Sequence, residues 1–225
     1  MSSTTLECIE IETQEKPEYA VIWLHGLGAD GNDFVPIIPE LQPDQLPAIR
    51  FLFPHAPARP VTVNNGMRMR AWYDIFTTDL VQREDEDGIR ESESAIRSLI
   101  ARENIRGIPT QNIILAGFSQ GCAMTLHTGL RLDEPLAGII GLSGYLPLQD
   151  KFPTERKSAN ENTPIFMGHG SMDPVVAISR GEASYEILKN LDYPVQWHQY
   201  PMPHSVCAEE IQDIAKFLQK VLVTG

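Results

Sequence analysis

The stretch LAGFSQG at 115–121 places one serine between two glycines, directly after an apolar run and before the helical segment CAMTLHTGL. Gly117, Ser119 and Gly121 form the pattern Gly-x-Ser-x-Gly. A serine in such a sharp strand-to-helix turn has a strained backbone, and the glycines let strand and helix approach each other. The turn lifts the hydroxyl next to the positive end of the helix, where a developing oxyanion is stabilised. Ser119 is therefore a candidate nucleophile; the alternative is a small-residue turn with a capping serine.

A serine hydroxyl is a poor nucleophile near neutral pH, so it needs a base, and the base needs a carboxylate that orients it. In folds that contain this type of turn, the three residues follow one another along the chain as serine, acid and histidine, each in a loop after a strand. Asp173 follows the apolar run 164–170, and His204 follows the run 195–200. The order and the positions predict that Ser119, Asp173 and His204 act as nucleophile, orienting acid and base.

The other candidates for these three roles are less well placed. Four of the remaining histidines precede the candidate acid and one lies inside a predicted strand: His25, His55, His127, His169 and His198. Asp192 lies in a surface turn and Asp150 follows an earlier strand. Ser143 also ends a strand, but a polar loop follows it instead of a helix. For His204 itself, the alternative is an ordinary histidine in a surface loop.

Acyl transfer also requires a pair of backbone N–H groups that stabilise the oxyanion. Gln120, the residue after the nucleophile, supplies one, and a loop after an early strand supplies the other. The segment HGLG at 25–28 lies in such a loop, so we assign Leu27 as the second donor; a plain strand-to-loop turn is the alternative. Its Gly-x-Gly also begins a dinucleotide motif, but no clear helix follows the third glycine, Gly31, so we discount a nicotinamide site.

Seven short apolar runs are the candidate strands that would position these residues: 6–11, 19–25, 49–53, 112–118, 136–143, 164–170 and 195–200. Runs such as 112–118 and 136–143 lack polar alternation, which indicates that both faces of those strands are covered. The run 6–11 does alternate and suits an edge strand. Strands that alternate with helical patterns predict a layered α/β fold with a mostly parallel sheet.

Two of the intervening helices can be predicted from their apolar faces. The first follows Asp87-Gly88 and has one apolar face: Ile89, Ile96, Leu99 and Ile100. For the last helix we expect Ser205 as the N-cap, followed by an apolar stripe: Cys207, Ile211, Ile214, Leu218 and Val221. The span 54–87 is predicted to be irregular, and we interpret its acidic end, EDEDG, as a solvated loop.

The bulk composition limits the class of protein. The 225 residues fit a single domain, 1–225, more naturally than two. A net charge of -12 without a basic cluster argues against nucleic acid as a partner. Three cysteines without a paired short spacing predict neither a disulfide framework nor a zinc site, and free thiols indicate a reducing compartment. Without a signal-like start or a long apolar run, we expect a cytoplasmic protein that does not insert stably into membranes.

Five blocks of the chain resemble the small bacterial carboxylesterases and the acyl-protein thioesterase and lysophospholipase family: AVIWLHGLGADGNDF, MRAWYDI, IILAGFSQGCAMTLHTGL, PIFMGHGSMDPVV and PMPHSVCAEEI. The resemblance covers most of the chain; the segment after Thr77 and the N-terminal LECIEI match it least well. It implies an α/β-hydrolase fold with helices on both faces of the sheet, the same triad and oxyanion donors, and a homodimer. It also implies supporting roles near the site for Trp72, Tyr73 and Asp74.

The predicted reaction is ester hydrolysis through an acyl-serine, without a metal or an organic cofactor. Larger relatives of this fold insert a cap domain between the runs 136–143 and 164–168, but here only about 20 residues separate them. We therefore expect no large cap domain and an active site whose entrance is open to solvent. Apolar residues near the motifs are candidates for an acyl groove, with ordinary packing as the equal alternative: Leu27, Ile75, Phe76, Leu146 and Val175.

Our main functional prediction is a carboxylesterase for small-molecule or lipid esters with short to medium acyl chains, which the bacterial character of the resemblance favours. The alternative is an acyl-protein thioesterase or lysophospholipase that acts on long acyl chains. A non-catalytic binding module on the same scaffold would lack a triad member or block the turn at Ser119, and this sequence does neither.

Overall fold

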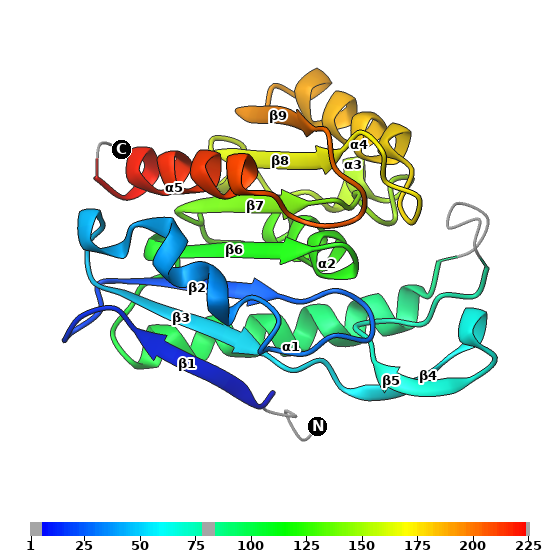
Figure 1. The fold of residues 1–225 in the computed structure, drawn as a ribbon, viewed down its shortest axis with the longest axis horizontal. Coiled ribbons are helices and arrows are strands. Elements are labelled where there is room, and N and C mark those ends of the chain that lie inside the picture. The colour runs from blue at the N-terminus through cyan, green and yellow to red at the C-terminus, as the bar shows by residue number, and fades with distance from the viewer. Residues whose placement is uncertain (1–5, 78–83, 224–225) are drawn as a thin grey trace.

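A computed structural model describes residues 6–77 and 84–223 of the protein. At its centre lies a seven-stranded sheet (Figure 1). The strand order is β1-β3-β2-β6-β7-β8-β9. All neighbours are parallel except β1, which pairs antiparallel with β3 at one edge. The strands are β1 (Cys8–Glu12), β2 (Tyr19–Leu24), β3 (Ile49–Pro54), β6 (Ile113–Phe118), β7 (Gly138–Leu142), β8 (Ile165–Gly170) and β9 (Val195–Tyr200). The seven predicted strands and the mostly parallel sheet are confirmed.

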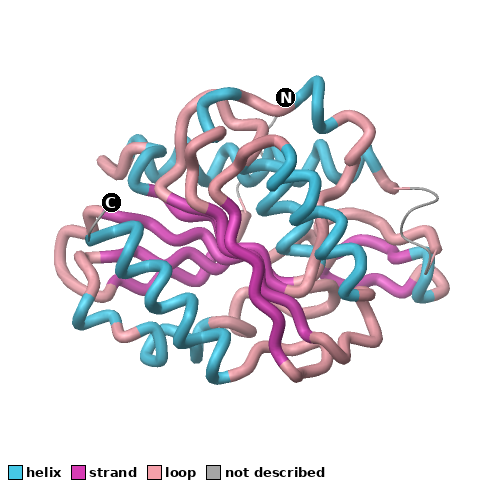
Figure 2. The backbone as a smooth tube through the Cα atoms, turned by 90° about the horizontal axis from the view of Figure 1, so that it is seen from above, coloured by secondary structure: helices cyan, strands magenta, loops and turns pink. Residues whose placement is uncertain are grey.

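Helices cover both faces of this sheet (Figure 2), which explains why its central strands are apolar on both sides. One face carries α1 (Glu86–Ile105), α2 (Gln120–Gly129) and α4 (Ile178–Asn190). The other carries the 3-10 helices η1 (Val35–Leu41) and η2 (Pro43–Gln45) and the last helix, α5 (Ala208–Val223). Four short helical turns complete the chain: η3 (Thr62–Asn64), η4 (Thr110–Asn112), α3 (Phe152–Glu155) and η5 (Ser158–Asn160). No helix within 6–77 and 84–223 is long and apolar enough to cross a bilayer.

The parallel register brings the carboxyl ends of the central strands to one edge of the sheet. Along this edge Leu24 pairs with Gly117 and Phe118 with Leu142, while Gly170 of β8 pairs with Tyr200 of β9. The loops that follow β2, β6, β8 and β9 therefore leave the sheet side by side, and these loops contain the predicted site residues.

The prediction of an irregular span at 54–87 is wrong in two places. Its first part contains an antiparallel hairpin, β4 (Ala58–Val61) and β5 (Met67–Arg70), and α1 begins at Glu86. The hairpin strands have only four residues each and no apolar run, so their pairing rests on backbone hydrogen bonds that leave little signal in the sequence. Asp85 caps α1 by accepting from the amide of Gly88. Residues 78–83 of this span lie outside the described residues.

The predicted start of the last helix is also wrong. Ser205 lies three residues before α5, and the first helical hydrogen bond runs from the Ile211 amide to the Cys207 carbonyl. The sequence offered a good capping residue, but the loop that carries His204 continues to Cys207 before the chain turns into the helix. The predicted apolar stripe is present, because Ile214 and Leu218 are fully buried against the sheet.

Candidate active site

Ser119 lies in a strained turn between β6 and α2. Its backbone has φ 56° and ψ -117°, a conformation that residues with side chains rarely adopt. A Cβ atom at position 117 would lie 2.3 Å from the Gly121 carbonyl oxygen, and one at 121 would lie 2.2 Å from the Leu24 oxygen. Both glycines are therefore needed for strand and helix to approach, as the sequence pattern predicts. The Ser119 amide donates to the Leu142 carbonyl at 2.8 Å, which anchors the turn on β7.

The three predicted residues of the triad form one chain of hydrogen bonds. His204 Nδ1 lies 2.6 Å from Asp173 Oδ2, and His204 Nε2 lies 2.9 Å from Ser119 Oγ. Because a carboxylate can only accept, Nδ1 carries the proton, and Nε2 is left as the acceptor for the serine hydroxyl. The His204 side chain is 15% exposed, so substrate and water can reach it while Asp173 stays fully buried. Residues 119, 173 and 204, far apart in sequence, are thus joined at one edge of the sheet.

The Asp173 carboxylate is held by its own loop. Its Oδ1 accepts from the amides of Val175 and Val176 at 2.8 and 2.9 Å, which leaves Oδ2 facing His204. His169 lies beneath this loop and donates from Nε2 to the Val176 carbonyl at 2.9 Å. Burial lowers the pKa of His169, so it stays neutral and supports the loop without adding a charge beside Asp173.

The two predicted oxyanion donors belong to the turn between β6 and α2 and to the loop after β2, which approach each other closely: a Cβ atom at Gly26 would lie 3.4 Å from the Ser119 Cβ. Gln120 opens α2, where a backbone N–H has no acceptor within the helix. The Leu27 amide likewise has no acceptor among the residues described, whereas the next amide, that of Gly28, donates to the Arg70 carbonyl at 2.9 Å. Both groups are free to bind an oxygen that becomes negative.

A set of buried hydrogen bonds that the sequence did not reveal ties these two loops together. The Gln120 side chain accepts from the Trp72 amide at Oε1 and donates from Nε2 to the Tyr73 carbonyl, both at 2.8 Å. The Trp72 indole donates to the His25 carbonyl at 2.9 Å. Trp72 and Tyr73 thus clamp both loops, in the supporting position that the resemblance implies. The only sequence signal for this was the match of the block MRAWYDI.

His25, which begins the loop of Leu27, is fixed as a neutral imidazole. Its Nε2 accepts from the Ala56 amide at 3.0 Å, and its Nδ1 donates to the Gly26 carbonyl at 2.7 Å. Burial lowers its pKa, which matches the neutral tautomer that these two bonds require. The buried ring holds the loop in place and has no free nitrogen for chemistry.

Besides Leu27, four residues were predicted to line an acyl groove, and they occupy different environments. Leu146 is fully buried in the core next to α2 and α4, although it also borders a cavity of about 380 Å³ near Arg180. Ile75 and Phe76 are half-buried, and Ile75 packs against that same core. Val175 is 64% exposed beside Asp173. Their role in holding an acyl chain stays a prediction.

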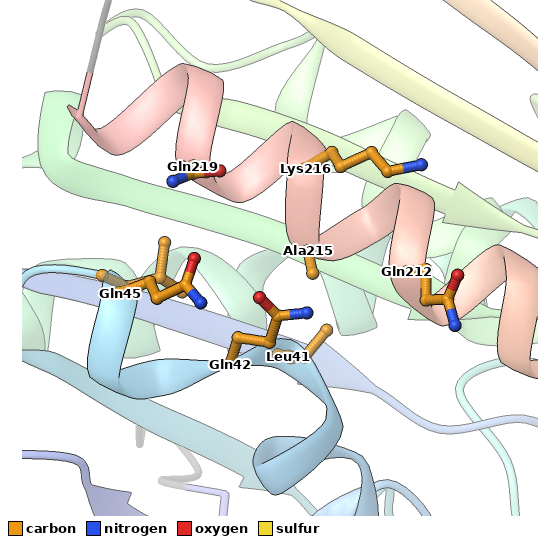
Figure 3. Close-up of a pocket in the computed structure, with 8 residues that line it drawn as sticks. Leu41, Gln42, Gln45, Gln212, Ala215, Lys216 and Gln219 are labelled. Atoms are coloured by element: carbon orange, nitrogen blue, oxygen red, sulfur yellow. The ribbon is translucent and has the colours of Figure 1, made fainter.

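Two of the cavities on the other face of the sheet lie beside η1 and α5. An open cavity of about 430 Å³ adjoins His204 and Phe118, and none of the predicted groove residues lines it. A second cavity, of about 210 Å³, lies between η1, η2 and α5 (Figure 3) and contains no member of the triad; Gln42, Gln45 and Lys216 are among its lining residues. No group of three or more side chains with metal-ligand chemistry gathers within 6–77 and 84–223.

Comparison with known proteins places residues 6–222 in one family. Residues 6–222 match the family described as Phospholipase/Carboxylesterase. Acyl-protein thioesterase 1 of Yarrowia lipolytica is 42% identical over 205 residues, 89% of this chain and 90% of that protein. The Mycosarcoma maydis protein of the same name is 41% identical over 222 residues, 92% of each chain. The crystal structure of Arabidopsis thaliana SOBER1 superposes with a TM-score of 0.85 at 30% identity, over 91% of this chain and 99% of that one. The chain belongs to the phospholipase/carboxylesterase family and has the α/β-hydrolase fold.

Proposed function

We propose that this protein is a serine thioesterase that removes long acyl chains from acylated proteins, with Ser119, His204 and Asp173 as its triad. The continuous hydrogen bonds from Ser119 Oγ through His204 to Asp173 are the observation that most strongly supports a serine hydrolase. Family and relatives support hydrolysis of esters or thioesters in general. Among the two substrate classes predicted from the sequence, the thioesterase names of relatives more than 40% identical favour the alternative over a short-chain carboxylesterase.

In the first half of the reaction Ser119 becomes acylated. Its Oγ forms a bond to the thioester carbonyl carbon while the hydroxyl proton passes to His204 Nε2, and the carbonyl π electrons move to the oxygen. The amides of Leu27 and Gln120 bind this oxyanion. When the carbonyl re-forms, the carbon–sulfur bond breaks, and the sulfur leaves as a thiol with the proton from His204. Asp173 stabilises the imidazolium between these two transfers.

In the second half water releases the acyl group. His204 takes a proton from water, whose oxygen bonds to the acyl carbon, and the same two amides bind the second oxyanion. Collapse breaks the bond to Ser119 Oγ, which regains its proton from His204, and a fatty acid leaves. The short connection between β7 and β8, which contains only α3 and η5, supports access for large substrates.

Two measurements test this function. A fluorophosphonate probe should label the wild type, and Ser119→Ala should lose both the label and about 10⁴-fold or more in kcat. With S-acyl-cysteine peptides of increasing acyl length, kcat/KM should rise from acetyl to palmitoyl. A fall with length, together with faster cleavage of short 4-nitrophenyl esters, would favour the short-chain carboxylesterase.

Ser143→Ala is the matched control for the labelling experiment. Ser143 directly follows β7, has a positive φ of 47° and is fully buried, and its hydroxyl has no hydrogen-bond partner among the described residues. This variant should keep the fluorophosphonate label. We also propose a cytoplasmic location, which three free cysteines, Cys8, Cys122 and Cys207, support because disulfides are rare in that compartment.

A further inference from the structure

The cavity beside His204 has an apolar floor and lies on the η1 and α5 face of the sheet, two elements that are side by side in Figure 1. Its apolar walls come from segments far apart in the chain: Phe34, Ile37, Phe118, Val206 and Ile211. These residues belong to or pack against the core on that face. Ile75 and Leu146, the predicted acyl contacts, pack in the core on the opposite face. The triad therefore lies between two separate apolar regions.

The chemistry assigns these regions to different parts of the substrate. In acyl transfer the proton that the base takes from serine is given to the leaving group, so the leaving group must lie next to the base. His204 forms part of the wall of the cavity and faces Ser119 with Nε2. A leaving group that receives its proton from His204 is thus positioned to extend into this cavity.

The rim of the cavity carries unneutralised negative charge. Asp33 and Glu40 line it and are exposed, and neither forms an ion pair with any described residue. No lysine or arginine is among the residues that line it. Partial desolvation raises the pKa of Asp33, and the further negative charge of Asp30 nearby raises it to a smaller extent. A positively charged group on the ligand would therefore pair with the carboxylates of Asp33 and Glu40.

We propose that this cavity binds the peptide side of an acyl-protein substrate, and that Asp33 and Glu40 select substrates with lysine or arginine beside the acylated cysteine. The inference rests on the thioesterase function proposed above. An apolar floor with an acidic rim is complementary to a short peptide that mixes apolar and basic side chains. The head group of lysophosphatidylcholine is less complementary, because its phosphate offsets the positive charge of its choline and leaves no net charge to pair with the two carboxylates.

Three S-octanoyl-cysteine peptides that differ only in flanking residues test the proposal: lysines, serines or glutamates. In the wild type, kcat/KM should fall from the lysine to the glutamate peptide by about tenfold at about 20 mM salt, and the ratio should shrink at about 0.5 M salt. In the double variant Asp33→Asn/Glu40→Gln, the ratio of kcat/KM for the lysine peptide to kcat/KM for the glutamate peptide should approach one. Rates are expressed per fluorophosphonate-reactive site, so that a misfolded fraction does not affect them.

The double variant Glu15→Gln/Glu18→Gln is the matched control. Both glutamates are exposed, form no ion pair with the described residues and lie between β1 and β2, at the opposite edge of the sheet. This control removes the same charge and should keep the wild-type order of peptides. If its ratio falls as far as that of Asp33→Asn/Glu40→Gln, the preference comes from net charge and the cavity assignment is overturned.

Three further outcomes would overturn the proposal, and they separate it from the proposed function. Equal kcat/KM for the three peptides in a wild type that cleaves them all would leave the thioesterase function intact and remove the subsite. Cleavage of none of them, and of none of the corresponding S-palmitoyl peptides, would remove both. A larger loss of kcat/KM on lysophosphatidylcholine than on the lysine peptide, in the Asp33→Asn/Glu40→Gln variant, would assign the cavity to a lipid head group.

Discussion

Asp173 accepts a hydrogen bond from His204 through one oxygen, Oδ2. A substitution that changes little more than this oxygen measures how much the contact contributes to kcat. Asp173→Asn keeps the size of the side chain but offers an amide to Nδ1, which favours the wrong imidazole tautomer. We expect kcat to fall about 10⁴-fold. Asp192→Asn is the control, since Asp192 is an exposed turn residue with φ 61° that asparagine also tolerates, and its kcat should not change. A kcat for Asp173→Asn within about tenfold of wild type would exclude Asp173 from the triad.

At the residue scale the sequence was most informative where one residue type has few chemical uses. Ser119, Asp173 and His204 were predicted from their order and from their positions after strands, and the structure joins them by hydrogen bonds. The clamp by the Gln120 side chain on Trp72 and Tyr73 could not be predicted. A glutamine can bond to any backbone group within reach, and which groups are within reach depends on the folded chain.

At the scale of elements, the first turn of α5 buries a carboxyl group against β8. Glu210 is fully buried and neither of its oxygens has a hydrogen-bond partner among the described residues. A Cβ at position 168 would lie 2.2 Å from Glu210 Oε1, so only the glycine there leaves room for it. Burial, and to a smaller extent the charge of Asp213, raises the pKa of Glu210 to about 8. The pKa values of Cys122, Tyr200 and Cys207 are also raised, mainly by burial and to a smaller extent by the charge of Glu210.

This raised pKa makes the free energy of unfolding depend on pH. Between the ordinary value of 4.5 and about 8 the folded protein keeps a proton on Glu210 that the unfolded chain releases, so the stability falls as pH rises. Glu210→Gln removes the titration. We expect the wild type to lose stability relative to Glu210→Gln by at most about 1.4 kcal/mol per pH unit in this window. Urea unfolding of both proteins across the window tests this; parallel pH profiles would contradict it.

Elements with strong periodicity were predicted well and elements without it were not. The seven sheet strands and the first long helix have apolar patterns that burial on the sheet requires. The hairpin of β4 and β5 was missed, because its stability comes from pairing of its two strands with each other and not from an apolar face. The start of α5 was misplaced because a capping residue acts only where the chain has already turned into a helix.

At the scale of the whole molecule, the resemblance predicts a homodimer. Static light scattering after size exclusion should then give a mass near twice the 25.1 kDa of one chain. A stable dimer typically buries about 800 Å² on each subunit, a small part of the 10184 Å² accessible surface of the described residues. A mass near 25.1 kDa at micromolar concentration would contradict the prediction.

The sequence by itself determined the fold class, the single α/β domain it predicts for 1–225, and the three residues joined at the sheet edge. It could do so because parallel strands always bring their carboxyl ends to one edge, so that order along the chain implies proximity in space. Only the tertiary structure decided which side chains support the loops and where a leaving group fits. The walls of the cavity beside His204 join Phe34 to Val206, and a contact between residues so distant in sequence exists only after the sheet and both of its helical layers have formed.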